Sequence, residues 1–211
     1  RESPILPYCW EVEFPEVFHR EGKGFDALVG NPPFLGGRRI SMRLGNEILD
    51  HLKLNHPNNS GSADLCAYFI RQAINLLSKN GAFGLILSDV VSQGDSRDVG
   101  LGHILQNGSD IFYAIKSMDW PGSDAGVKIA IVCASKLNFH GEKLLNGQGT
   151  TRINSSLSSG SDIDIKPLKD NQEICYSGHY LGSRGFVIDK ELALRLDKSS
   201  AGCVFPYYKG E

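Results

Sequence analysis

The sequence predicts an open, mostly parallel α/β sheet, and two observations carry that prediction. Short apolar runs of strand length alternate with stretches of helical character, in the order strand, helix, strand, helix, strand, strand. That order is typical of sheets that have helices packed against their faces. The composition agrees with a globular domain, since 41% of the 211 residues are hydrophobic and 22% are charged.

The predicted elements follow one another along the first two thirds of the chain. Residues 25–30, FDALVG, predict a buried parallel strand, because the run is apolar and ends at a glycine. Residues 62–80 predict a helix with one broad apolar face, and Gly81 is its expected C-cap. Residues 82–87, AFGLIL, predict a second buried strand. A short helix at 97–105 and strands at 111–115 and 127–133 follow, and the last strand is expected to run antiparallel.

Composition divides the chain into three regions. Residues 1–137 hold the predicted α/β elements, after an opening segment in which Pro15 prevents one long helix. Residues 138–165 are polar and rich in Ser and Gly, which predicts a loop or a boundary. Residues 166–211 begin a further region, with an amphipathic stretch at 190–196.

The net charge and the cysteines indicate which partners and which cellular compartment to expect. The formal net charge of −2 argues against a general electrostatic attraction to nucleic acid, so DNA contacts would need a local basic patch or protein outside this chain. The five cysteines are scattered and form no metal-ligand spacing, which predicts a reducing compartment, no disulfide framework and no metal site. No apolar run reaches membrane-spanning length, and we expect a cytoplasmic protein without a membrane partner.

Asn31-Pro32-Pro33-Phe34 follows the first predicted strand directly and is the strongest functional signal. An exocyclic amine on a nucleobase is a poor nucleophile, because its lone pair is delocalised into the ring. The Asn31 side-chain oxygen and the Pro32 carbonyl could hold both N–H bonds out of that plane, and the prolines would keep the carbonyl rigid. Phe34 offers a face on which a flipped base could stack. The loop lies at the carboxyl end of a strand, where ligands of open α/β sheets bind.

This motif resembles that of the amino-methyltransferases, in which Asp, Asn or Ser precedes Pro-Pro and an aromatic residue. The wider sequence resembles the large single-chain restriction-modification methyltransferases that read asymmetric sites, and their phage-defence relatives. The resemblance covers about residues 5–136, including GFDALVGNPPFLGG and SADLCAYFIRQAINLL. Residues 172–209 resemble, less closely, the start of the target-recognition region in those proteins.

The resemblance implies a fold and a reaction. The fold would be the C-terminal half of a Rossmann-like S-adenosylmethionine-dependent methyltransferase sheet. Residues 1–137 would be the catalytic part, and 166–211 the start of target recognition. The reaction would be direct methyl transfer from S-adenosyl-L-methionine to the N6 amine of a flipped-out adenine in double-stranded DNA.

The resemblance also implies roles for individual residues. Asn31 and Pro32 would hold the amine, Phe34 would stack on the base, and Asn31 and Pro33 would touch the cofactor. Trp120 matches a second stacking aromatic, although an amphipathic ring covering the sheet edge explains it equally well.

Further positions near the motif have two interpretations each. Asp64 matches the helix that borders the cofactor pocket, but a carboxylate favoured by the helix dipole is the simpler interpretation. Arg38, Arg39 and Arg43 are candidates for contacts with DNA phosphates, and their alternative is a solvated loop.

The glycine-rich turn that binds the methionine end of the cofactor in this family has no counterpart before residue 31 or after it. We therefore expect a fragment of a longer protein, inactive in isolation, whose exposed sheet edge pairs with the remainder of the parent protein or with another copy.

Other reactions and roles remain open on the sequence alone. The same loop chemistry serves N4 methylation of cytosine in DNA, N2 methylation of guanine in rRNA and methylation of a glutamine amide in a protein. Methylation of cytosine C5 is disfavoured, because it needs a cysteine nucleophile and no Pro-Cys pair occurs. The alternative from another class is a non-catalytic fragment that recognises DNA or bridges subunits.

Overall fold

The computed structural model describes residues 8–56, 61–121, 126–162 and 187–197. The chain separates into two compact units, Arg1–Ile163 and Asp164–Glu211. In the second unit the described part is a short segment with one helix, α8 (Lys190–Asp197), at the predicted amphipathic stretch. The region boundaries expected at residues 137 and 165 stay predictions. The predicted target-recognition region at 166–211 lies mostly outside the described residues.

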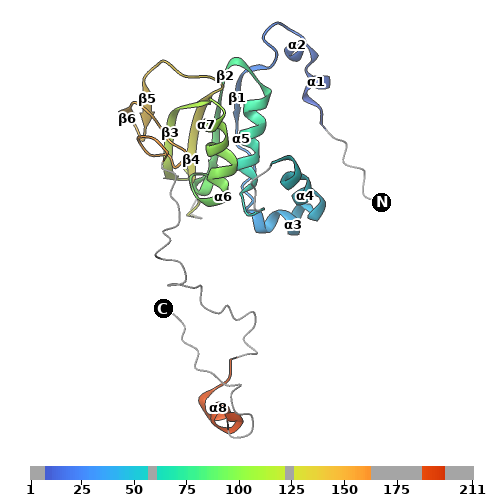
Figure 1. Ribbon diagram of the computed structural model, residues 1–211, viewed down its shortest axis with the longest axis vertical. Helices are drawn as coiled ribbons and strands as arrows, with labels where there is room; N and C mark the ends of the chain where they lie inside the picture. Colours follow the sequence, from blue (N-terminus) through green and yellow to red (C-terminus); the bar gives the residue numbers. More distant parts are fainter. Residues whose placement is uncertain (1–7, 57–60, 122–125, 163–186, 198–211) are drawn as a thin grey trace. The chain divides into compact units, whose positions relative to one another are not determined.

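The first unit is built on a mixed six-stranded sheet, shown in Figure 1, whose strand order is β1-β2-β4-β3-β5-β6. β1 and β2 are parallel, and β4 runs antiparallel to both β2 and β3. The antiparallel direction of the fourth strand confirms the expectation for the last predicted strand. The strands are β1 (Phe25–Gly30), β2 (Leu77–Ser88), β3 (Asp110–Asp119), β4 (Lys128–Ser135), β5 (Lys143–Leu145) and β6 (Gln148–Thr150).

One face of the sheet is covered by α5 (Leu65–Leu76) and by a helical segment that ends in α7 (His103–Gln106). Cys66 and Ile70 of α5 and Ile104 of α7 pack with alternate residues of β2 and β4 in the main hydrophobic core. Alternation arises because successive side chains of a strand point to opposite faces. The helical segment runs without a break from α6 (Gly94–Arg97) through a π-helical turn (Asp98–Gly102) into α7. It confirms the helix predicted at 97–105 and extends it.

The predicted boundary between the long helix and the second strand was wrong. The helix ends at Leu76, and Leu77 already has extended backbone angles and pairs with Phe25 of β1. Gly81 therefore lies inside β2 and does not cap the helix. A Cβ at Gly81 would come within 2.6 Å of the Phe25 carbonyl oxygen, so this glycine allows the two strands to approach closely.

The prediction of full burial for the first strand was also wrong. β1 exists as predicted, but it is an edge strand whose partner among the described residues is β2. Val29 is 90% exposed, because no described element covers the outer face of β1. An unpaired strand edge with an exposed apolar side chain is a surface on which another chain can add a strand.

The polar region after residue 137 contains more regular structure than a loop. β5 pairs in parallel with β3, and β6 returns beside β5 through a tight turn in which Asn146 has φ of 50°. Ile153 and Leu157 of the following segment are buried in the main core. Apolar residues spaced this widely gave no periodic signal, so the sequence predicted a loop.

Two pairs of helices pack against the start of β1 and the start of α5. α1 (Trp10–Glu13) and α2 (Pro15–Phe18) are separated at Pro15, as expected. The rings of Trp10, Phe14 and Phe18 each contact Phe25 at centroid distances between 5.4 and 5.7 Å, which attaches this segment to β1. α3 (Gly37–Leu44) and α4 (Asn46–Asn55) form a second small core with the start of α5. Among the described residues, no helix has the length and apolarity needed to cross a membrane.

Candidate active site

The predicted catalytic loop follows β1 at the carboxyl end of the strand. Pro32 is buried, whereas Asn31 and Pro33 are exposed and Phe34 is half-buried against the main core. The loop lines a cavity of about 370 Å³ together with Trp120 and Val127, which come from the connection between β3 and β4. Since β3 runs parallel to β1, the fold brings the ends of these two strands to the same edge of the sheet.

Phe34 and Trp120 form the aromatic part of this cavity. Their ring centroids are 6.3 Å apart and the planes meet at 73°, an edge-to-face arrangement. A planar base that stacks on one of these rings therefore presents its edge to the other. The Trp120 backbone N–H donates to the Val127 carbonyl at 2.9 Å, which fixes the position where its side chain leaves the sheet. Both interpretations of Trp120 are compatible with this position.

Asp64 anchors the loop to α5. Its carboxylate accepts hydrogen bonds from the backbone N–H of Cys66 at 3.0 Å, as the helix N-cap, and from that of Leu35 at 3.3 Å. The Leu35 carbonyl in turn accepts from the N–H of Leu65 at 2.9 Å. The N–H of Asp64 donates to the Ser96 hydroxyl at 2.8 Å. Asp64 is 5% exposed, so these bonds are shielded from water and fix the end of the catalytic loop.

Gly37 holds the next turn of chain against the segment before α5. A Cβ at this buried position would lie within 2.4–2.6 Å of the Ser62 backbone, which cannot move aside like the end of a side chain. The neighbouring Gly36 has open space around it and φ of −57°, which suits any residue.

We therefore predict that Gly37→Ala lowers the free energy of unfolding by about 1–3 kcal/mol, because it overpacks this contact. Gly36→Ala should change it by less than about 0.5 kcal/mol. Urea denaturation of both variants checks the pair, and equal effects would contradict a specific backbone contact at Gly37.

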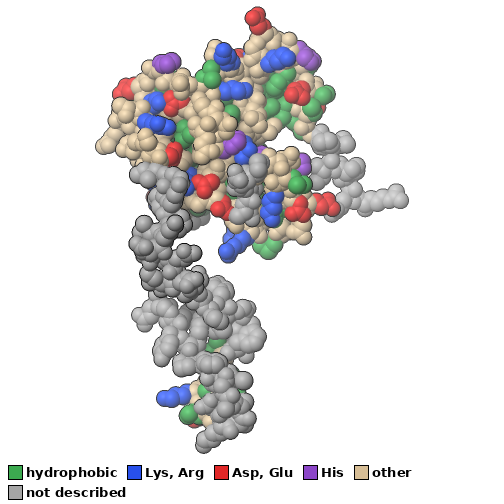
Figure 2. Space-filling model, in the orientation of Figure 1, with side chains coloured by type: hydrophobic (Ala, Val, Ile, Leu, Met, Phe, Trp, Pro, Cys, Tyr) green, Lys and Arg blue, Asp and Glu red, His purple; other side chains and the backbone are tan. Residues whose placement is uncertain are grey.

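The predicted DNA-contacting arginines lie on α3, directly after the loop. Arg38, Arg39 and Arg43 are all exposed, and none of them forms an ion pair with a residue that the structure describes. Figure 2 shows Lys and Arg side chains over the α3 and α4 region, with acidic side chains beside them. The three guanidinium groups are therefore available to an external anion.

The buried cysteine nearest the loop does not have the properties of a nucleophile. Burial raises the pKa of the Cys66 thiol to about 12, and the negative charge of Asp64 adds to the effect. The thiol is therefore neutral near pH 7 and packs as a small core residue. Among the parts of the chain that are described, no group of three or more His, Cys, Asp or Glu side chains has a metal-binding arrangement.

Sequence reasoning missed three contributors to this site. Val127 lines the cavity, Ser96 binds the backbone of Asp64, and Ser62 packs on Gly37. Each acts through tertiary contact with a residue far away in the sequence, and no local pattern identifies such contacts. By contrast, the fold brings Asn31, Pro32, Phe34 and Trp120 together as predicted from the resemblance, whereas their roles stay predictions.

The cavity suits a flat, partly apolar ligand with an exocyclic amine. It offers aromatic walls, the Asn31 amide and the rigid Pro32 carbonyl. The exposed Pro33 and Asn31 line the same cavity, and their contact with the adenine end of S-adenosylmethionine stays a prediction. The described residues that line the cavity include no glycine-rich turn for the methionine end, so the fit to the cofactor is partial.

Comparison with known proteins supports a methyltransferase of the restriction-modification type. Residues 4–104 match the family model described as Eco57I restriction-modification methylase, which is slightly less than half of the chain. No curated protein matches this chain.

The chain is also similar in structure to solved proteins. One is the Type IIL restriction-modification enzyme MmeI in complex with DNA, with 18% identity and a TM-score of 0.58 over 82% of this chain and 25% of that one. Others are a putative class I S-adenosylmethionine-dependent methyltransferase from Listeria monocytogenes (14% identity, 57% and 34% covered, TM-score 0.42) and the M protein of the Type I restriction enzyme EcoKI (14%, 64% and 23%, 0.36).

The likeness to MmeI shows the fold, and this chain spans only about a quarter of that enzyme. The predicted α/β fold class is therefore confirmed, with a mixed sheet of six strands.

Proposed function

We propose that this chain carries the target-base half of a DNA methyltransferase active site that modifies the N6 amine of adenine. The single observation that supports it most strongly is the cavity in which Asn31, Pro32 and Phe34 meet Trp120 at one edge of the sheet. The proposed biological setting is a restriction-modification or phage-defence system, as the matched family suggests.

The chain's own residues would bind and orient the amine. The Asn31 side-chain oxygen and the Pro32 carbonyl each accept one N–H of the flipped adenine, which draws the nitrogen lone pair out of conjugation with the ring. Phe34 stacks on the base, and Trp120 contacts it from the second side. Asp64 keeps the loop in position through its bond to the Leu35 N–H.

S-adenosyl-L-methionine would supply an electrophilic methyl group on a sulfonium centre. Asn31 and Pro33 would contact it from the loop. With the amine held by Asn31 and Pro32, its nitrogen would take the methyl group as the carbon–sulfur bond breaks with its electrons on sulfur, and the amine proton would pass to solvent water. No covalent enzyme intermediate is required, in keeping with the neutral thiol of Cys66.

The experiment that tests this proposal compares substrates for the full-length protein with labelled S-adenosylmethionine. Duplex DNA, ribosomal RNA and a protein with an exposed glutamine are each incubated with it, and transferred label is counted. We expect label in DNA alone. Label only in RNA or protein would instead favour guanine N2 or glutamine amide methylation, and DNA binding without transfer would favour a non-catalytic role.

The three arginines of α3 are expected to bind DNA phosphates. Replacing Arg38, Arg39 and Arg43 with glutamine should weaken binding to any duplex and reduce the slope of log affinity against log salt by about 0.9 for each phosphate that the variant no longer neutralises. Lys79→Gln is the control for loss of charge alone, because Lys79 is exposed near the start of β2, at the end of the strand away from the candidate active site. Fluorescence anisotropy at several salt concentrations measures both, and an unchanged slope in the triple variant would assign these arginines to solvent.

A further inference from the structure

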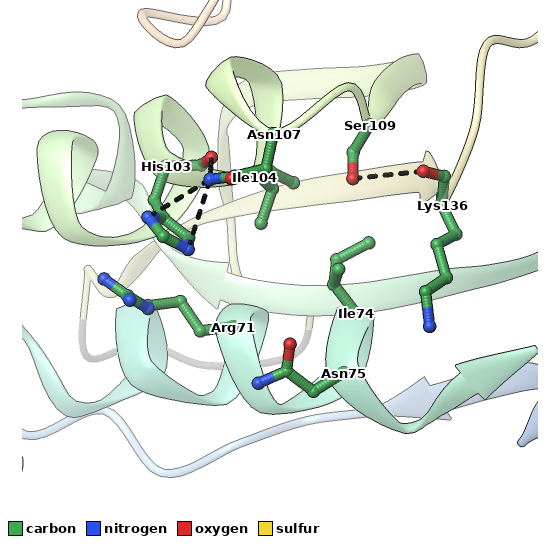
Figure 3. Close-up of a pocket in the computed structure, with 8 residues that line it drawn as sticks. All are labelled: Arg71, Ile74, Asn75, His103, Ile104, Asn107, Ser109 and Lys136. Carbon is green, nitrogen blue, oxygen red and sulfur yellow. Dashed lines mark hydrogen bonds between the residues drawn. The ribbon is translucent and has the colours of Figure 1, made fainter. Parts of the chain in front are cut away.

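A second cavity lies at the other end of the sheet from the candidate active site. It has a volume of about 250 Å³ and is lined by residues of α5, of α7 and of the strand ends beside them. Figure 3 shows Arg71 and Asn75 from α5, His103 from α7 and Asn107 directly after it, with Lys136 on the far side. None of the eight lining residues is acidic. The polar lining therefore carries no negative side-chain charge.

Part of this lining already has a structural role. Lys136 donates from its ammonium group to the Leu77 carbonyl, the C-cap of α5, at 2.5 Å. Asn107 donates from its amide to the His103 carbonyl at 2.7 Å and so caps α7. These bonds satisfy carbonyls at both helix ends, where the helix dipole favours cations. The other polar groups that line the cavity include Arg71, Asn75 and the His103 ring, whose nitrogens lie 3.4–3.5 Å from the Asn107 amide nitrogen.

Arg71 is a half-buried cation without a counter-ion. It forms no ion pair with any residue in the described ranges, and burial lowers the pKa of its guanidinium group. Charges removed from water are normally paired, because desolvation is otherwise uncompensated. The Arg71 guanidinium group is therefore able to pair with an anion that enters the cavity.

The pKa values of two neighbouring histidines are lowered mainly by burial and, to a smaller extent, by nearby positive charge. Burial and the charge of Arg71 lower the pKa of His103. The pKa of His56 falls to about 4, first through burial and then through the charges of Arg71, His103 and His51. The His56 Nδ1 atom is buried and has no hydrogen-bond partner. The charged or titratable groups around Arg71 thus include these histidines and the Tyr68 phenol. Among the described residues, no carboxylate forms an ion pair with Arg71.

We propose that this cavity binds a phosphate group, with Arg71 as its principal ligand and Asn75 and His103 as further donors. A guanidinium fork matches two oxygens of a tetrahedral phosphate, and amide and imidazole N–H groups reach the others. The volume would hold roughly eight waters at about 30 Å³ each, enough for a phosphate with a small attached group. It is below the usual size of a pocket for a whole nucleotide.

This site is separate from the methyl-transfer site. Ser109 and Lys136 of the cavity flank the start of β3 and the end of β4, whereas Trp120 follows the end of β3. β3 has 10 residues, so the two ends are roughly 30 Å apart at about 3.3 Å per residue. A phosphate there cannot be that of the flipped nucleotide. Its source is either a free phosphate compound or the backbone of nucleic acid elsewhere on the protein.

The test follows the His103 ring and the Arg71 Nε–H by NMR at constant ionic strength, with sodium chloride replaced stepwise by inorganic phosphate. We expect a saturable shift of both signals and a rise in the pKa of His103, because a bound anion stabilises the imidazolium. Arg71→Gln should weaken binding by at least about tenfold, and Lys79→Gln should leave it unchanged. Circular dichroism checks that each variant is folded. If Arg71→Gln is not folded, His103→Gln replaces it, with Arg71 Nε–H as the signal.

A second arm uses a short DNA duplex at the same ionic strength. Saturation by inorganic phosphate identifies a free phosphate compound as the source. Saturation by the duplex alone, abolished in Arg71→Gln, identifies backbone phosphate. No saturable shift with either probe, or equal binding by Arg71→Gln, would overturn the proposal. Neither arm involves methyl transfer, so the result is independent of the proposed function.

Discussion

Asn31→Ala should lower the rate of methyl transfer by on the order of a hundredfold to a thousandfold while the protein remains folded. The substitution removes one of the two acceptors that orient the amine, and loss of one such electrostatic interaction typically costs that much. Asn31 is exposed and its side chain bonds to no residue among those described, so its removal should barely affect stability. Single-turnover transfer of label from S-adenosylmethionine to DNA by the full-length protein measures the rate.

Asn80→Ala is the matched control, since Asn80 is exposed in β2 and its amide, like that of Asn31, has no hydrogen-bond partner among the described residues. Its transfer rate should equal that of the unmodified protein. DNA affinity of Asn31→Ala, measured by anisotropy, should change by no more than a few-fold. Near-normal transfer by Asn31→Ala would remove this residue from the mechanism.

Asp64→Ala should lower the free energy of unfolding by about 2–4 kcal/mol and reduce methyl transfer as well. The change removes the N-cap of α5 and leaves the buried N–H of Cys66 and the partly buried N–H of Leu35 without their acceptor. Because Leu35 directly follows the catalytic loop, the loop loses one of its fixed points. Urea denaturation gives the stability, and the labelled transfer assay gives the activity.

Asp64→Asn separates the hydrogen bonds from the charge. Asparagine is nearly as good an N-cap as aspartate and keeps one acceptor oxygen, so its loss of stability should be below about 1 kcal/mol. Its transfer rate should lie closer to that of the unmodified protein than to that of Asp64→Ala. Equal behaviour of the two variants would show that the carboxylate charge, and not its geometry as an acceptor, is what matters.

Local patterns predicted the elements of the fold better than their ends. The apolar run at Phe25–Gly30 predicted β1, and helical periodicity predicted α5. The helix-to-strand change at Leu77 could not be predicted, since pairing with β1 outweighs the helical preference of the residues that follow Leu76. The exposure of Val29 likewise depends on which elements cover β1, which no local pattern contains.

The candidate site was predictable where a contiguous motif carries it. Asn31-Pro32-Pro33-Phe34 combines a rigid loop with an acceptor and an aromatic ring, and its position after a strand predicted the sheet edge. Trp120 was found through resemblance alone, because it lies far along the chain from the loop and only the fold brings the two together. The loop anchor at Asp64 and the cavity around Arg71 depend on tertiary packing, which no sequence pattern near either residue reveals.

Identifying the modified nucleoside is the most direct test of the central claim. That claim is that adenine N6 is methylated in the cavity lined by Asn31 and Trp120. DNA treated with the full-length protein and S-adenosylmethionine is digested to nucleosides and analysed by mass spectrometry. We predict N6-methyladenine, at a level that falls on the order of a hundredfold or more in Asn31→Ala. N4-methylcytosine would contradict the assignment of the target base, and N6-methyladenine at an undiminished level in Asn31→Ala would contradict the assignment of the site.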